Sequence, residues 1–151
     1  MTAQDKQNKA RKAWMGLLAK SPGERLAALT GHMTGWPEYE WLRPPEVGGV
    51  MVRGRTGGTG APFNLGEMTV TRCALRLATG EVGHGYVQGR DKAHAERAAL
   101  IDALMQTERA EELRRAVLDP LETQLQADKA SRAAKAAATK VDFFTMVRGE
   151  D

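Results

Sequence analysis

The chain has 151 residues, enough for one modest hydrophobic core and therefore for a single domain of ordinary size. Its formal net charge of +3 is mildly basic, which is compatible with anionic ligands but does not by itself indicate nucleic-acid binding. The one cysteine, Cys73, excludes an internal disulfide and fits a reducing compartment. Residues 1–12 lack the apolar core of a signal peptide, and no apolar run is long enough to span a membrane, so we expect a cytoplasmic protein without membrane contact.

The first part of the chain predicts two helices. Residues 5–19 place apolar side chains on one helical face. In the next segment Ser21 is expected to cap a second helix, with Pro22 at its first position and Glu24 completing a capping box. This second helix should end at Gly31, in the left-handed conformation that glycine adopts at many helix ends.

Aromatic and β-branched residues in two-residue alternation follow, and they predict an antiparallel four-stranded meander. Pro44-Pro45 is expected to end the first strand, and Thr79-Gly80 to form the hairpin turn before the last. Cys73 falls inside the third strand, where a buried inert thiol is a simpler interpretation than a nucleophile. The four expected strands cover residues 38–43, 49–55, 67–78 and 81–88.

A helix after the last strand carries the most unusual pattern. Asp91 is placed to cap it, and residues 92–106 are rich in alanine and leucine. His94 and Arg97 fall on the apolar arc of this helix, whereas Asp102 falls on the opposite, polar side. Polar groups on an apolar face occur at functional sites. His94 therefore has two interpretations: a hydrogen-bonded core or subunit-contact residue, or a direct ligand or catalytic group.

The C-terminal part changes character. Residues 109–117 predict a charged helix that stops before Pro120, and residues 121–140 an alanine-rich helix that buries little. The apolar tail, residues 141–147, either docks on a partner or folds back onto the sheet of its own chain, and we predict docking. The residues expected to dock are Phe143, Phe144, Met146 and Val147.

The order of the elements predicts an α+β fold, in which N-terminal helices and the helix after the last strand flank the sheet. We expect an α+β core domain at residues 1–107, and a helical arm with the docking tail at residues 108–151.

A glycine-rich loop lies between the second and third expected strands. Its backbone amides at Gly57, Gly58, Thr59 and Gly60 could approach an oxyanion, with Arg53 and Arg55 adding positive charge. A flexible connection or a tight subunit contact is the plainer interpretation, since glycine often serves only a turn.

Three blocks of sequence resemble the PhnG family, the G subunit of the carbon–phosphorus lyase core complex. They are residues 55–60 with Thr71-Arg72, residues 87–105, and the tail 141–149. The resemblance runs from Trp14 onward and is weakest in residues 4–12 and in the alanine-rich helix. It implies bacterial phosphonate catabolism in the cytoplasm.

The resemblance also implies a reaction and a set of partners. The G subunit acts with the H, I and L subunits to replace the adenine of ATP with an alkylphosphonate, which gives ribose 1-methylphosphonate 5-triphosphate. A J subunit later breaks the carbon–phosphorus bond. The core holds two copies each of G, H, I and J, and G embraces I. We therefore expect a transferase subunit that is inactive alone, with ATP as a substrate of the complex.

No nucleophile–base pair, zinc-ligand cluster or phosphate loop stands out in the sequence. We accordingly expect no catalytic residue, no metal and no cofactor bound by this chain alone. Eight polar residues are candidates for a substrate or shared site, because arginines could hold phosphate or phosphonate oxygens and acidic groups could stabilise positive charge at the ribose carbon. These candidates are Arg53, Arg55, Gln88, Arg90, Asp91, His94, Glu96 and Arg97.

A different class of protein shares the expected element order, the double-stranded-RNA-binding module. Such modules carry several lysines at the start of the second helix to grip phosphates. Here Ala93 and Glu96 occupy that turn, and Glu96 would repel phosphate. We therefore expect no nucleic-acid partner, although an RNA-binding-like module is the alternative. A free-standing hydrolase has no supporting constellation.

Overall fold

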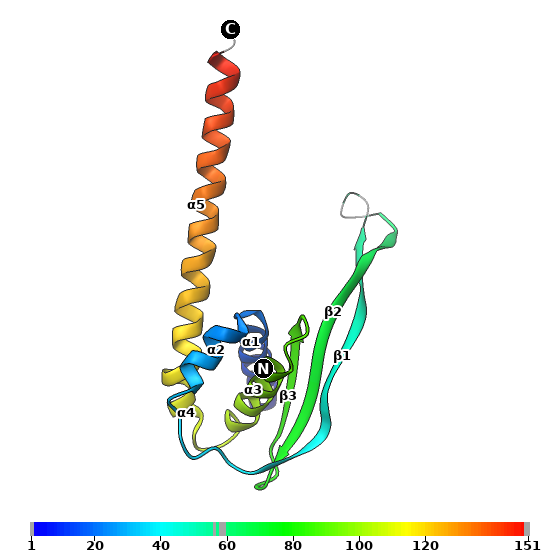
Figure 1. Cartoon of the computed structure of the whole chain (residues 1–151), viewed down its shortest axis with the longest axis vertical. Helices are drawn as coiled ribbons and strands as arrows, with labels where there is room; N and C mark the ends of the chain where they lie inside the picture. Colours follow the sequence, from blue (N-terminus) through cyan, green and yellow to red (C-terminus); the bar gives the residue numbers. More distant parts are fainter. Residues whose placement is uncertain (1, 56, 58–59, 150–151) are drawn as a thin grey trace.

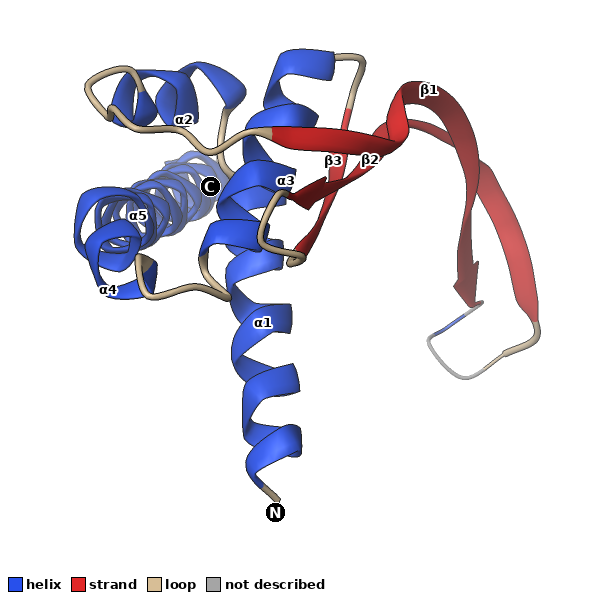
Figure 2. Ribbon diagram, turned by 90° about the horizontal axis from the view of Figure 1, so that it is seen from below, coloured by secondary structure: helices blue, strands red, loops and turns tan. Residues whose placement is uncertain are grey.

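The computed structural model describes residues 2–55, 57 and 60–149, apart from the side chains of Asn64 and of residues 141–149. It confirms the predicted α+β class, with helices gathered on one side of an antiparallel sheet (Figures 1 and 2). In chain order the elements are α1 (Ala3–Lys20), α2 (Gly23–Thr30), β1 (Tyr39–Arg55), β2 (Pro62–Leu77), β3 (Val82–Gln88), α3 (Lys92–Leu104), α4 (Ala110–Leu113), a π-helical segment η2 (Arg114–Leu118) and α5 (Asp119–Gly149).

The sheet has the strand order β1-β2-β3, and both pairings are antiparallel. β1 pairs with β2 along its whole length, from Tyr39 opposite Leu77 to Arg55 opposite Pro62. β3 pairs only with the second half of β2, between Val70 and Arg76. Beyond Val70, β1 and β2 therefore continue as a two-stranded ribbon, which curves away from the body of the protein (Figure 2). We call this part, residues 49–55 and 60–69, the ribbon.

All four predicted strand segments lie in this sheet, but the prediction that Pro44-Pro45 ends a strand was wrong. The first two segments run on into each other as β1, with register irregularities from Trp41 to Glu46. β1 lies at the edge of the sheet. Proline is tolerated at an edge or a bulge because the ladder hydrogen bond that it cannot donate is not needed there.

Asp102 on α3 is fully buried, so its predicted place on a polar helix face was wrong. Its carboxylate accepts hydrogen bonds from Arg11 Nε and Nη2 at 3.1 and 2.9 Å, and from Trp14 Nε1 at 2.8 Å. It also accepts from the backbone N–H of His84 on β3 at 2.9 Å. A buried carboxylate is tolerated only when its charge and lone pairs are satisfied in this way. Asp102 thus joins α1, α3 and β3.

α3 lies very close to β3, and two glycines make this approach possible. A Cβ atom on Gly83 would overlap the carbonyl oxygen of Ala99, and one on Gly85 would overlap that of Ala95. Small side chains face each other across this contact, which brings the backbones together. The core continues on the same side with large buried residues such as Leu75.

The two predicted ends of the second helix were wrong in detail. Ser21 Oγ donates to Leu17 O at 2.8 Å, so this hydroxyl serves the end of α1 and does not cap α2. Pro22 occupies the N-cap position of α2. Gly31 has φ −63°, a right-handed conformation, because the chain continues the helical turn for one more residue. No left-handed cap is needed there.

The prediction that the helix at residues 109–117 stops before Pro120 was wrong. α4, η2 and α5 follow one another without a break, and this proline is the second residue of α5, just after η2. A π-helical turn changes which carbonyl groups face the next turn, so a residue without an N–H is accommodated there. Leu113, Val117 and Leu121 are buried in the same core as α3. The core therefore extends past residue 107, and the division at 107/108 stays a prediction.

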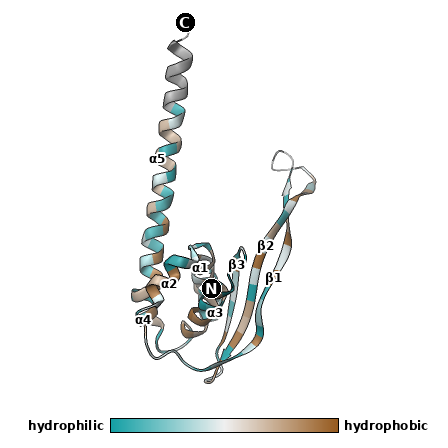
Figure 3. Ribbon diagram, in the orientation of Figure 1, coloured by the Kyte–Doolittle hydropathy of each residue, from teal (hydrophilic) through white to brown (hydrophobic). Residues whose placement is uncertain are grey.

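Two elements project from the same side of the body, the ribbon and the distal part of α5 (Figure 1). From residue 131 to residue 140 every side chain of α5 is exposed. Apolar residues also occur along the ribbon, where no helix covers them (Figure 3). Among the helices that the structure describes, none combines the length and apolar character required to cross a membrane.

We expect Asp102→Ala to lower the free energy of unfolding by about 3–5 kcal/mol, because the change leaves the partly buried Arg11 without its ion-pair partner and the Trp14 and His84 donors unpaired. Urea unfolding followed by circular dichroism measures this loss. Glu111→Ala removes an exposed carboxylate and is the matched control. Equal stability of the two variants would contradict the joining role of Asp102.

Candidate functional site

The N-terminus of α3 holds Asp91 and His94 in structural contacts. Asp91 Oδ1 accepts from the backbone N–H of His94 at 3.0 Å, which confirms the predicted N-cap. His94 is buried, and its Nε2 donates to Leu18 O at 2.8 Å near the end of α1. Gly23 at the start of α2 lies so close that a Cβ there would meet both side chains. These contacts fit the interpretation of His94 as a hydrogen-bonded core residue.

Glu96 and Arg97, one turn further along α3, line a cleft of about 390 Å³, which we call the α3 cleft. The cleft lies between α3 and the segment that runs from α2 into β1. Of the eight candidate site residues, Glu96 and Arg97 thus share one cavity. The residues lining the cleft are Ala27, Thr30, Gly31, Met33, Trp36, Tyr39, Glu96, Arg97 and Leu100.

The loop that carries Trp36 is held by Arg109, which precedes α4. Arg109 Nη1 donates to Gly35 O at 2.8 Å, and its Nη2 donates to Thr34 O at 3.3 Å. Glu112 holds the same guanidinium through Nε at 3.1 Å. Trp36 therefore lies on a loop whose backbone is held by hydrogen bonds to two carbonyl groups, those of Thr34 and Gly35.

The electrostatics of the α3 cleft come from three titratable side chains. Burial raises the pKa of the Tyr39 phenol, and the Glu96 carboxylate raises it further, because a phenolate would stand near another negative charge. Among the residues that the structure describes, neither Glu96 nor Arg97 belongs to an ion pair, and the Glu96 carboxylate lies within hydrogen-bonding reach of the Tyr39 phenol. The guanidinium of Arg97 and the remaining lone pairs of Glu96 can therefore bind a ligand.

The other predicted site residues lie elsewhere. Gln88 and Arg90 are exposed at the end of β3, where Gln88 Nε2 donates to Met68 Sδ. Arg53 and Arg55 are exposed on the ribbon, far from α3 in Figure 1. The eight candidates therefore fall into separate groups and do not form one site within this chain.

Two groups of predicted residues fall partly outside the described structure. In the glycine-rich loop, Gly57 has φ +63° and Gly60 is described, whereas Gly58 and Thr59 lie outside. The backbone of the tail belongs to α5, but the side chains of the predicted docking residues lie outside. Docking by Phe143, Phe144, Met146 and Val147 stays a prediction.

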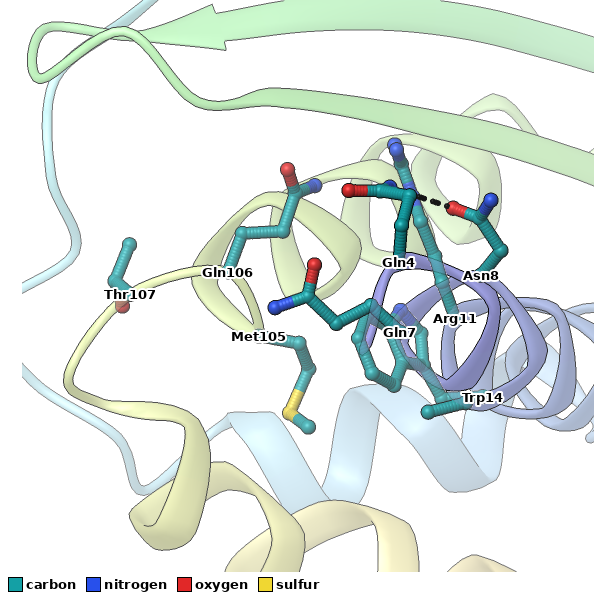
Figure 4. Close-up of a pocket in the computed structure, with 9 residues that line it drawn as sticks. Gln4, Gln7, Asn8, Arg11, Trp14, Met105, Gln106 and Thr107 are labelled. Carbon is teal, nitrogen blue, oxygen red and sulfur yellow. Dashed lines mark hydrogen bonds between the residues drawn. The ribbon is translucent and has the colours of Figure 1, made fainter. Parts of the chain in front are cut away.

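Sequence reasoning missed a second cavity, of about 490 Å³, between the start of α1 and the turn after α3 (Figure 4). Gln4, Gln7 and Asn8 face Gln106 across it. Arg11 also lines this cavity, but its positive charge is neutralised by the ion pair with Asp102. The signal was present in the sequence, because carboxamides at helical spacings of three and four residues share one face. Such a slot offers hydrogen bonds but little net charge.

Cys73 is buried, as expected for an inert thiol. Its Sγ donates to Ala95 O at 3.2 Å, and burial raises the pKa of the thiol to about 11. A thiol of this kind is a poor nucleophile near neutral pH, because the thiolate is the reactive form. Within the described part of the chain, no group of three or more His, Cys, Asp and Glu side chains is arranged to hold a metal ion.

The raised pKa of Cys73 predicts how stability depends on pH. The pKa rises from an ordinary value of 9.0 in the unfolded chain to about 11 in the folded one. Between these values the unfolded chain loses a proton that the folded chain keeps, so the free energy of unfolding should fall as pH rises through this window, and the contribution is fully present below it. Urea unfolding across the window measures the slope, which should be smaller in Cys73→Ala.

A thiol reagent gives an independent check of the same burial. Native protein should react slowly at about pH 8, and urea-unfolded protein quickly. Equally fast labelling of both states would contradict the buried position of Cys73.

Comparisons with known proteins agree along nearly the whole chain. A family model described as "Phosphonate metabolism protein PhnG" matches residues 9–149. A curated protein of Rhizobium meliloti (strain 1021) is 48% identical over 141 residues, which cover 93% of this chain and 90% of that protein. It is named alpha-D-ribose 1-methylphosphonate 5-triphosphate synthase subunit PhnG. The α3 cleft lies inside the matched range, whereas Gln4, Gln7 and Asn8 precede it.

Proposed function

Since the chain belongs to the PhnG family of phosphonate metabolism proteins, we propose that it is the G subunit of a ribose 1-methylphosphonate 5-triphosphate synthase. The observation that carries the proposal is the 48% identity to a subunit of that name over 93% of the chain. In the proposed reaction the chain acts in the cytoplasm with H, I and L subunits, and an alkylphosphonate replaces the adenine of ATP. No observation favours the RNA-binding-like alternative.

The distribution of the candidate residues supports a subunit that does not work alone. Glu96 and Arg97 share a cleft, whereas Arg53 and Arg55 lie on the ribbon. Transfer of a phosphonate to a ribose carbon needs groups that converge on one reacting centre. In the proposed complex, partner chains supply the groups that this chain does not bring together.

The two projecting elements support contacts with partner subunits. Met51, Phe63 and Leu65 on the ribbon are 54%, 44% and 61% exposed. A two-stranded ribbon alone is marginally stable in water, and exposed apolar side chains commonly mark an interface. We propose that the ribbon and α5 bind the I subunit most directly, in a core with two copies each of the G, H, I and J subunits.

Reconstitution with purified subunits tests the function. The chain alone should release no adenine from ATP and methylphosphonate, whereas the chain with H, I and L should do so. Leaving this chain out should abolish release, because its surfaces complete the site. Adenine release by the isolated chain, or undiminished release without it, would refute the proposal. The measurement is adenine quantified by chromatography.

The tail makes a separate prediction about assembly. Deleting residues 141–151 should leave a folded protein with an unchanged melting temperature, because the core ends near Leu121 and Leu125 on α5. Capture by the tagged I subunit should be lost, since large apolar side chains at interfaces commonly contribute about 2 kcal/mol or more each. Deleting only residues 150–151 is the control. Unfolding of the longer truncation would place the tail in the core, and normal capture would refute docking.

A further inference from the structure

The α3 cleft combines one cation, one carboxylate, one phenol and an apolar wall, and no role is assigned to it. We propose that it binds a pentose that carries a single phosphoryl or phosphonyl group, with Arg97 on the anionic oxygens, Glu96 and Tyr39 on the sugar hydroxyls, and Trp36 against the sugar ring. The proposal rests on the proposed function. It assigns to this chain the ribose and its C1 phosphonate, and leaves the triphosphate to other subunits.

Arg97 is the anchor for the anionic group. Its guanidinium presents donors in a planar fork that matches two oxygens of a phosphoryl or phosphonyl group. It is half-buried on α3, and the part of the chain that the structure describes offers it no acidic partner. Partial burial strengthens a charge–charge contact relative to one in open water. A half-buried guanidinium of this kind therefore favours an anionic ligand.

The charge balance of the cleft sets how much anionic charge it can hold. Among the described residues that line the cleft, Arg97 is the one cation, and Glu96 beside it carries a negative charge. A triphosphate carries several negative charges and would meet repulsion from Glu96. A single phosphoryl or phosphonyl group needs only the one guanidinium, so the cleft suits that end of the sugar.

Glu96 and Tyr39 provide polar contacts of the kind that a sugar requires. An ionised carboxylate only accepts hydrogen bonds, and neighbouring hydroxyl groups are suitable donors to it. The phenol of Tyr39 lies within hydrogen-bonding reach of Glu96, so its proton can go to the carboxylate while its oxygen still accepts from a sugar hydroxyl. The remaining lone pairs of Glu96 accept from a neighbouring hydroxyl, so the two side chains together suit a pair of hydroxyls.

The apolar part of the cleft completes the recognition. Trp36 is 37% exposed and, with Met33 and Leu100, supplies apolar lining. The C–H face of a pentose ring and the methyl group of a methylphosphonate both suit such a wall. The volume of about 390 Å³ falls within the usual range for small-molecule pockets. Because Arg109 tethers the loop at Gly35, the indole needs little rearrangement to receive a ligand.

Calorimetry on the assembled complex tests the cleft, with ribose 1-phosphate as the probe and ribose 5-phosphate, methylphosphonate and inorganic triphosphate as comparisons. Ribose 1-phosphate should bind most tightly. Arg97→Gln should weaken its binding roughly tenfold or more, because a charge-assisted contact is lost. Arg97→Lys should fall between, since the charge stays and the fork is lost. Arg115→Gln, at an exposed arginine outside the cleft, should bind as the wild type does.

Each other outcome has a defined meaning. Equal affinity of the wild-type and Arg97→Gln complexes, or no binding of ribose 1-phosphate to either, overturns the proposal. Tighter Arg97-dependent binding of ribose 5-phosphate or of triphosphate overturns the assignment of the C1 end. Capture by the I subunit and melting temperature show whether a variant still folds and assembles. Adenine release by the wild-type complex is measured in parallel, so a failure of the proposed function is seen separately from a failure of the cleft.

Discussion

The rest of the structure depends on one buried carboxylate. Asp102 accepts hydrogen bonds from Arg11, Trp14 and the backbone of His84, and so fixes α1 and β3 to α3. The same cluster covers the start of the outer edge of β3, because Val82 O accepts from Arg11 Nη2 at 3.1 Å and from Gln106 Nε2 at 2.8 Å. Backbone groups that are already bonded cannot pair with another strand, so this part of the edge is protected from unwanted association.

A helix held in this way is a suitable base for the α3 cleft. β3 contacts α3 through two glycines, and Asp91 caps the first turn of α3. Only the opposite wall, which carries Trp36, belongs to a loop, and Arg109 holds that loop. Binding sites need side chains on rigid elements, and here Glu96 and Arg97 lie on the most constrained helix of the fold.

The features that sequence reasoning predicted correctly depend on neighbouring residues. The Asp91 cap and the strand alternation are visible within a few positions. The burial of Asp102 was missed because its partner Arg11 lies 91 positions away, and no local pattern shows which helix face a distant arginine will meet. The residues of the α3 cleft show the same difference between local and distant information. Glu96 and Arg97 were selected from one helix, whereas Trp36 and Tyr39 reach them only through the tertiary fold.

The ribbon has a consequence for copies of the protein that are not assembled with other subunits. Its strands lack a third neighbour beyond Val70, so the backbone amides that point outward from β1 and β2 there have no partner strand. Segments with few buried contacts open first, and open segments are the ones that proteases cut. We expect surplus copies to be degraded from the ribbon, while assembled copies are protected if partner subunits bind the ribbon as proposed. Degradation of the excess would then keep the number of subunits matched to the number of complexes.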